Sequence, residues 1–426
     1  MTAAPARVRI PGLVLTDHVL DVPLDHADPA GPTIEVFARE AVSVDRVGDD
    51  LPWLLFLQGG PGGASPRPTG RAPSWLWHAA KTHRVLLLDQ RGTGRSTPVT
   101  GSTTHGMQPG QLAGYLRLFR ADSIVADAEM FRAQVAGGGP WDTLGQSYGG
   151  FVTLTYLSQA AEGLRTCYVT GGLPGLTTSA DEVYERTYPR VAAKNAEFYR
   201  RYPDDVAAVR AIADHLASHD IRLPDGDRLT VRRLQLLGMG FGMSDGFEKV
   251  HWLLESAWHG TELSSTFRYE VMAATGFVDR PFYALQEFIY GQGTEATGWA
   301  AERALGEHPR FAPDATPLLF TGEMMYPFMF REIAALRPFE EAAHLLAEAG
   351  DWAPLYDPAR LAGNEVPLVA AVYHDDMYVD ADLQLVTARH VGHTRVWVTN
   401  EYEHDGLRVS DAKVLARLMD MAAGRI

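Results

Sequence analysis

The pentapeptide Gly145-Gln146-Ser147-Tyr148-Gly149 constrains the fold more than any other stretch of the chain. It follows a short apolar run and precedes an apolar segment of helical spacing, from Phe151 to Ala161. A Gly-x-Ser-x-Gly pattern in this context predicts a strand, a sharp turn and a helix, because the small residues let strand and helix approach closely. Such a turn lifts the serine hydroxyl above the sheet edge and aims the helix N-terminus at the group it attacks. We therefore predict that Ser147 is a nucleophile.

The segments around this turn alternate between strand-like and helical patterns. Continuous apolar runs predict strands that are buried on both faces, and an amphipathic pattern predicts a helix just before the serine strand. Repeated strand–helix units of this length imply a parallel, doubly wound sheet. Residues 13–42 are predicted to add antiparallel strands. The predicted buried strands are Pro52–Gln58, Arg84–Asp89 and Thr166–Gly171, and the helices are Ser74–Thr82 and Asp122–Val135.

From about residue 176 to residue 350 the pattern changes to helical segments rich in aromatic residues, without an internal repeat. Strand-like runs return at Pro367–Tyr373 and Thr394–Thr399, and a last helix is predicted over Ser410–Ala423. Pro317–Glu323 fits a strand or a loop. We therefore predict an α/β domain of residues 1–175 and 350–426 with an inserted helical cap, residues 176–349. The predicted cap helices include Ala180–Tyr202, Asp204–Ser218, Glu248–Trp258, Pro281–Tyr290 and Phe328–Gly350.

Charge and composition exclude several classes of protein. The formal net charge is −15, from 38 basic and 53 acidic residues, and the chain has no cluster of Lys and Arg. Nucleic acid and anionic membranes are therefore not expected as partners. The chain shows no apolar signal core at its start and no run of about 18 apolar residues, so we expect a cytoplasmic protein. The single cysteine, Cys167, excludes an intrachain disulfide and is expected to be a buried, inert thiol.

A serine nucleophile needs a base and an acid that orients the base. In an open parallel sheet, residues after the carboxyl ends of the strands converge on one site. His404 follows the last predicted strand and precedes a glycine, so we predict that it is the base. The other histidines, including His374, His390 and His393, are more simply explained as exposed or core residues.

Asp375 and Asp376 compete for the role of the acid. Both follow the predicted strand Pro367–Tyr373. We favour Asp376 because it lies three residues beyond the last apolar position, which leaves room for a turn that points it inward. The alternative is that both aspartates only cap the following helix, since aspartate is a common cap.

The oxyanion formed during acyl transfer needs two N–H donors. One is expected from Tyr148, the residue after the nucleophile. The other is expected from the glycine-rich run after the first buried strand, where we favour Gly60 over Gly59. A phosphate cradle is disfavoured because the run lacks a following Gly-Lys-Ser/Thr and the G-x-G-x-x-G spacing. No H-E-x-x-H or comparable ligand spacing occurs, so neither a metal nor another cofactor is expected.

Three of these motifs resemble those of the prolyl aminopeptidase (proline iminopeptidase) family of α/β-hydrolases. Gln58-Gly-Gly-Pro-Gly-Gly is similar to the family's H-G-G-P-G-G loop, with glutamine in place of histidine. Asp89-Gln-Arg-Gly-Thr-Gly-Arg-Ser matches D-Q-R-G-x-G-x-S, and Gly145-Gln-Ser-Tyr-Gly-Gly matches G-x-S-W/Y-G-G. The segments around Asp376 and His404 resemble the branch with the larger cap. The resemblance implies an α/β-hydrolase fold. The glycine-rich turn Gly92–Ser96 is itself expected to be structural.

The resemblance also implies an activity, namely the removal of an N-terminal residue, preferentially proline, from small peptides by a serine mechanism. Such a site must recognise a free amine, and the family has a cap glutamate in an E-x-x-Y-like helix. Glu287, followed by Tyr290, fits this pattern loosely, and Glu323 is a second candidate because it ends an apolar run. The alternative for either glutamate is an exposed or structural charge.

Other functions remain open at this stage. The same fold and triad also serve esterases, amidases and lactone-opening enzymes that act on small molecules. A non-catalytic binding protein would require a missing triad residue, and none is missing from the sequence. No sequence pattern indicates an oligomeric state.

Overall fold

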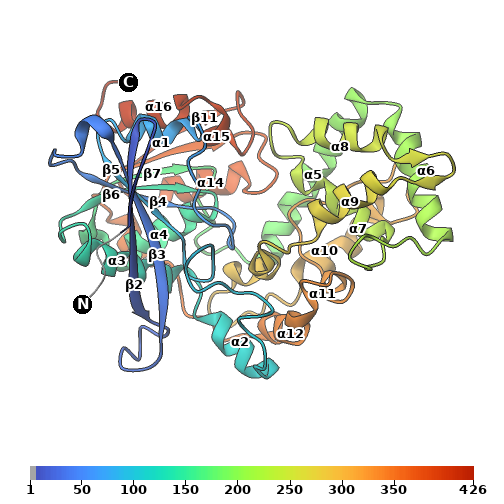
Figure 1. The fold of residues 1–426 in the computed structure, drawn as a ribbon, viewed down its shortest axis with the longest axis horizontal. Helices are drawn as coiled ribbons and strands as arrows, with labels where there is room; N and C mark the ends of the chain where they lie inside the picture. Colours follow the sequence, from blue (N-terminus) through green and yellow to red (C-terminus); the bar gives the residue numbers. More distant parts are fainter. Residues whose placement is uncertain (1–5) are drawn as a thin grey trace.

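A computed structural model describes residues 6–426 of the chain (Figure 1). The strands are β1 (Arg7–Ile10), β2 (Leu13–Pro23), β3 (Thr33–Ser43), β4 (Trp53–Leu57), β5 (Arg84–Leu88), β6 (Trp141–Gln146), β7 (Leu164–Thr170), β8 (Trp258–His259), β9 (Glu262–Leu263), β10 (Leu368–Tyr373) and β11 (Thr394–Thr399). The α-helices are α1 (Ser74–Ala79), α2 (Pro109–Arg117), α3 (Ala121–Gln134), α4 (Tyr148–Gln159), α5 (Ala180–Arg201), α6 (Asp205–Ser218), α7 (Val231–Gln235), α8 (Gly246–Glu255), α9 (Ser265–Thr275), α10 (Ala300–Glu307), α11 (Pro327–Glu332), α12 (Glu340–Glu348), α13 (Pro358–Ala362), α14 (Ala381–His390), α15 (Gly406–Val409) and α16 (Lys413–Ala422). The 3₁₀ helices are η1 (Val44–Arg46), η2 (Ala161–Gly163), η3 (Leu236–Gly240), η4 (Pro281–Tyr290), η5 (Pro309–Phe311) and η6 (Arg337–Phe339).

Nine strands of the described part form one sheet in the order β1-β2-β3-β5-β4-β6-β7-β10-β11. The strands from β5 to β11 in this order run parallel, whereas β1, β2 and β3 form an antiparallel edge that joins β5. This order places β6, and therefore the turn after it, in the middle of the sheet between β4 and β7. The predicted mostly parallel α/β sheet is confirmed.

Helices cover both faces of the sheet, as Figure 1 shows for α1 and α16 on one side and α3 and α4 on the other. The side chains of the central strands alternate between these two layers. Leu55 and Leu57 belong to the core beneath α3 and α4, while Leu54 and Phe56 belong to the core beneath α1 and α16. Burial on both faces explains why these strands are continuous apolar runs.

The elements from α5 to α12 lie mainly to one side of the sheet (Figure 1). α12 contacts α2, which joins this helical part to the α/β part. The domain boundaries at residues 176 and 349 stay a prediction. Within residues 6–426, no helix combines the length and the apolar character needed to cross a membrane.

Several details differ from the sequence-based expectations or decide between alternatives that they left open. The predicted helix Phe328–Gly350 is interrupted, because Pro338 cannot donate a backbone hydrogen bond inside a helix and lies in η6, between α11 and α12. The ambiguous segment Pro317–Glu323 contains neither helix nor strand. The edge strand β1 was not predicted, because its exposed residues carry no alternating apolar pattern.

Candidate active site

Ser147 occupies the sharp turn between β6 and α4, with φ 53° and ψ −123°. Such a backbone conformation is costly for a residue other than glycine and persists only where the surroundings impose it. The neighbouring glycines make the turn possible. A Cβ atom on Gly145 would lie 2.4 Å from the carbonyl oxygen of Gly149, and one on Gly149 would lie 1.9 Å from that of Leu57. The glycine pattern is therefore a steric requirement for bringing α4 against β4 and β6.

Asp376 lies in the turn after β10 and is fully buried, with 0% of its surface exposed. One carboxylate oxygen accepts the backbone N–H of Tyr378 at 2.8 Å. The other lies 2.6 Å from Nδ1 of His404. Asp375, by contrast, is exposed and contacts the neighbouring ring of His374. The structure thus brings Asp376, and not Asp375, against the predicted base.

His404 is buried in the loop after β11, and its backbone N–H donates to the carbonyl of Gly242 in the helical part, at 3.1 Å. Its ring centroid lies 4.8 Å from that of Tyr378. Burial lowers the pKa of His404, but the negative charges of Asp376, Glu323 and other nearby acids outweigh burial and raise this pKa above its ordinary value. The surroundings therefore favour the imidazolium that a general base forms.

Ser147 and His404 each border one of the two adjacent glycines that follow β7. A Cβ atom on Gly172 would lie 2.2 Å from the carbonyl oxygen of Ser147, and one on Gly171 would lie 3.1 Å from Nδ1 of His404. Within the described residues, no hydrogen bond joins the Ser147 hydroxyl to His404. Catalytic hydrogen bonds are often long without substrate and tighten when it binds.

The glycine-rich loop after β4 lies directly beside the nucleophile. A Cβ atom on Gly59 would come within 2.9 Å of the Ser147 Cβ and 3.6 Å of its hydroxyl oxygen. Gly60 follows with φ 123°, a conformation that favours glycine. Tyr148 begins α4, so its N–H has no acceptor within the helix. The N–H groups of Gly60 and Tyr148 have no protein acceptor among residues 6–426, which leaves both free to bind an oxyanion.

A second glycine-rich turn, after β5, supports this loop. The Gln90 side chain donates to the Gln58 carbonyl at 2.9 Å. The buried Asp89 carboxylate accepts N–H groups from Ser65 at 3.0 Å and from Arg95 at 2.9 Å. The residues from Asp89 to Ser96 therefore position the loop that holds Gly60, in agreement with the structural role expected for this turn.

Glu323 lies close to the His404–Asp376 pair and is partly exposed. Its carboxylate accepts a hydrogen bond from the Tyr283 hydroxyl. Burial raises the pKa of Glu323 to about 7, and the charges of His404 and Asp376 also act on it. The backbone of Tyr283 in turn touches the glycine-rich loop, since a Cβ atom on Gly62 would lie 2.7 Å from its nitrogen. Glu323 is therefore linked through Tyr283 to the loop beside Ser147.

Glu287 is buried within the helical part and has a different environment. Its carboxylate oxygens accept the backbone N–H groups of Ala300 at 3.0 Å and Ala301 at 3.3 Å, at the start of α10. Burial raises its pKa to about 7. A carboxylate at a helix N-terminus satisfies donors that the helix leaves free. The structure thus engages Glu287 with α10, whereas the charge of Glu323 acts on His404 and raises its pKa.

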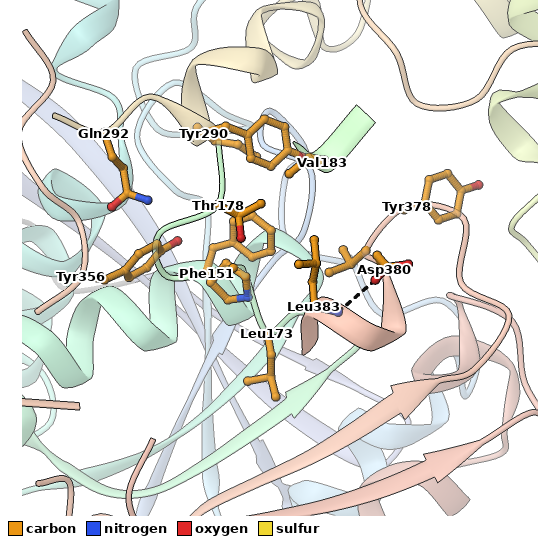
Figure 2. Close-up of a pocket in the computed structure, with 14 residues that line it drawn as sticks. Phe151, Leu173, Thr178, Val183, Tyr290, Gln292, Tyr356, Tyr378, Asp380 and Leu383 are labelled. Atoms are coloured by element: carbon orange, nitrogen blue, oxygen red, sulfur yellow. Dashed lines mark hydrogen bonds between the residues drawn. The ribbon is translucent and has the colours of Figure 1, made fainter. Parts of the chain in front are cut away.

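A small cavity of about 20 Å³ borders α4, the helix that follows the elbow (Figure 2). Its lining comes from α4 (Phe151), the segment after β7 (Leu173), η4 (Tyr290) and α14 (Leu383), with Tyr378 at one side. The lining is mostly apolar. The only hydrogen bond drawn in Figure 2 runs from the Leu383 N–H to Asp380 and caps α14.

Sequence reasoning did not single out Tyr378 as a neighbour of the site, and Tyr283 entered it only as part of the predicted cap helix Pro281–Tyr290. Tyr378 follows Asp376 by two residues, so a turn that points the aspartate inward also brings this ring to His404. Tyr283 has no such sequence signal, because its contact with Glu323 joins two distant segments.

The sheet and the elbow define the chain as an α/β-hydrolase, and residues 52–219 match a family model described as "alpha/beta hydrolase fold". The chain is 48% identical over 420 residues to a proline iminopeptidase of Aeromonas sobria, with 98% of each chain covered. It is 34% identical over 426 residues to a proline iminopeptidase of Aspergillus aculeatus, covering 95% of this chain and 93% of that one. The chain therefore belongs to the proline iminopeptidase family, and the resemblance carried by the three motifs is confirmed.

The chain is also similar in fold to solved structures of much lower sequence identity. One is a lipase described as putative from Acinetobacter baumannii, 11% identical with a TM-score of 0.45, covering 97% of this chain and 93% of that one.

Proposed function

We propose that this protein is a serine exopeptidase that releases an N-terminal residue, preferentially proline, from peptides. The observation that carries the proposal is the buried contact of 2.6 Å between His404 and Asp376. His404 borders Gly171, and Ser147 borders the adjacent Gly172. Membership of the proline iminopeptidase family supports the choice of substrate. A cytoplasmic location stays a prediction from the sequence.

In the proposed reaction, His404 takes the proton of the Ser147 hydroxyl as the oxygen attacks the carbonyl carbon of the N-terminal residue. The N–H groups of Gly60 and Tyr148 stabilise the oxyanion. Asp376 holds the imidazole in one tautomer and stabilises the imidazolium. His404 then gives its proton to the departing amine, and a water molecule, activated by the same imidazole, hydrolyses the acyl-enzyme.

We assign recognition of the substrate amine to Glu323. Its position beside His404 and its restricted contact with water favour an ion pair with an ammonium or imino group. Glu287, the second candidate, is bound to the backbone at the start of α10. It shares with Glu323 an effect on Tyr290, because, besides burial, the charges of both glutamates raise the pKa of that tyrosine. The small cavity that borders α4 is too small for a pyrrolidine ring. The ring would therefore rest at the mouth of this cavity, against Tyr290 and Tyr378.

Hydrolysis of proline β-naphthylamide, N-acetylproline β-naphthylamide and p-nitrophenyl acetate tests this function. We expect the free-amine proline substrate to have the highest kcat/KM and acetylation of its nitrogen to abolish most of the activity, because Glu323 then lacks a cationic partner. A profile over other aminoacyl naphthylamides measures the preference for proline. Equal hydrolysis of the free and acetylated substrates, or hydrolysis of the ester alone, would instead favour the alternative of an esterase or amidase.

Replacing Glu323 with glutamine is expected to raise KM for free-amine substrates about 10- to 100-fold, since hydrogen bonds to charged groups contribute about 1.5–3 kcal/mol. The pH profile should change as well. Glu323 binds a cation only when it is ionised, so its pKa of about 7 makes wild-type kcat/KM fall as the pH drops below neutral, in addition to the fall caused by protonation of His404. The variant should keep only the His404 contribution, so its acidic limb should be less steep. The limb should also lie at lower pH, because the charge of Glu323 no longer raises the pKa of His404.

Glu307→Gln is the matched control for this variant, because Glu307 is an exposed glutamate of α10 outside the site. It should reproduce both the KM and the pH profile of the wild type. An unchanged KM in Glu323→Gln would show that the amine is bound elsewhere.

A further inference from the structure

A groove of about 650 Å³ opens in the helical part and is larger than the small cavity that borders α4. Its volume lies within the range of about 300–1,000 Å³ that is typical of small-molecule sites. Residues of η3 and α8 and of the loop between them give it a largely apolar lining, which includes Leu237, Met239, Met243, Val250, Trp252 and Leu253. Trp252 is 59% exposed, which is unusual for so large an apolar side chain and leaves it available to a ligand.

One end of this groove is formed by two residues of the candidate active site. Tyr378, whose ring lies against His404, lines both the groove and the small cavity of Figure 2. Its hydroxyl donates to the Met239 carbonyl in the groove at 2.6 Å. Tyr283 lines the same end and binds Glu323. The groove therefore begins at the point where a substrate held by Glu323 would meet the catalytic pair.

A cation lies at this end of the groove. Arg280 is exposed, and its guanidinium carbon lies 4.9 Å from the centre of the Tyr283 ring. Among residues 6–426, no salt bridge involves Arg280, whereas Lys249, the other cation of the lining, pairs with Asp245 at 2.9 Å. The lining also contains one acid, the exposed Glu270. Arg280 is thus the cation available to an incoming carboxylate.

We propose that this groove binds the part of the peptide that follows the released residue and that it selects di- and tripeptides with apolar residues and a free carboxyl terminus. This inference rests on the proposed exopeptidase function. The apolar lining accepts the side chains after the scissile bond, and Arg280 pairs with the terminal carboxylate. Arg280 and Glu323 both contact Tyr283, one at its ring and the other at its hydroxyl, so the peptide that spans both charges is short.

The test compares prolinamide with Pro-Leu, Pro-Leu-Leu, C-terminally amidated Pro-Leu-Leu and Pro-Gly-Gly. Wild-type kcat/KM should be about threefold to fivefold higher for Pro-Leu-Leu than for its amide, a ratio typical of one solvent-accessible ion pair. Arg280→Gln should bring this ratio close to one. Trp252→Ala should lower kcat/KM about fivefold for Pro-Leu-Leu but not for Pro-Gly-Gly, because only leucine side chains use the apolar lining.

Two surface variants serve as controls. Arg331→Ala removes an exposed arginine of α11, and Trp258→Ala removes an exposed tryptophan, and neither residue lines the groove. Both should keep the wild-type ratios. If prolinamide is hydrolysed but wild type cleaves the free and amidated peptides equally, or if Arg280→Gln matches Arg331→Ala, the groove assignment is wrong. If prolinamide and all peptides resist hydrolysis, the exopeptidase function itself is wrong and the groove assignment falls with it.

Discussion

Replacing Ser147 with alanine is expected to lower kcat for proline β-naphthylamide about 10⁴- to 10⁶-fold, because the acyl-enzyme can no longer form. The residual rate would come from the oxyanion donors and from substrate binding. The fold should be retained, since alanine keeps the Cβ atom and removes only a hydroxyl that forms no hydrogen bond within the described residues. Steady-state kinetics measure the loss, and circular dichroism checks the fold.

Ser158→Ala is the control that separates loss of chemistry from loss of structure. Ser158 lies on the same helix, where its hydroxyl donates to the Leu154 carbonyl and accepts the Asp357 N–H. Its removal should cost about 1 kcal/mol of stability without a large change in kcat. A fluorophosphonate probe should label Ser147 in the wild type and in Ser158→Ala, but not in Ser147→Ala. A Ser147→Ala enzyme with near-wild-type turnover would exclude the serine mechanism.

Much of the fold could be predicted because its signals are local. The elbow is marked by a local pattern, because the glycines that its close contacts require lie within two positions of Ser147, at 145 and 149. The buried strands β4 and β5 are continuous apolar runs because both faces are covered, and that pattern can be read directly. The helix after Ser147 could be predicted because its apolar residues recur at helical spacing.

The remaining parts of the site depend on contacts between segments distant in sequence. Glu323 and His404 interact although they belong to segments far apart in the sequence, and no local pattern around either residue encodes that interaction. Glu287 shows the same difficulty. Its sequence context resembles an amine-binding motif, but its oxygens contact the start of α10, which lies 13 and 14 residues further along the chain. The order of residues along the chain therefore could not decide which of the two glutamates binds the substrate amine.

Replacing Asp376 with asparagine is expected to lower kcat about 10⁴-fold, because an amide does not hold the imidazole in the tautomer that accepts the serine proton. The backbone N–H of Tyr378 can still find an acceptor in the amide oxygen, so the turn should survive. The pH profile gives a second readout. Asp376 raises the pKa of His404 and also that of Glu323, so its loss lowers both values and should move the acidic limb of the residual activity to lower pH.

Asp375→Asn is the matched comparison, because it makes the same chemical change one position away. Asp375 is exposed and contacts only the exposed ring of His374, so water and counterions already screen its charge. We expect less than about a twofold change in kcat and no shift of the acidic limb, since surface ion pairs contribute about 0–1 kcal/mol. A severe loss in Asp375→Asn with an active Asp376→Asn would reverse the assignment. Equal, modest losses in both would mean that the contact between His404 and Asp376 orients the loop after β11 rather than the proton transfer.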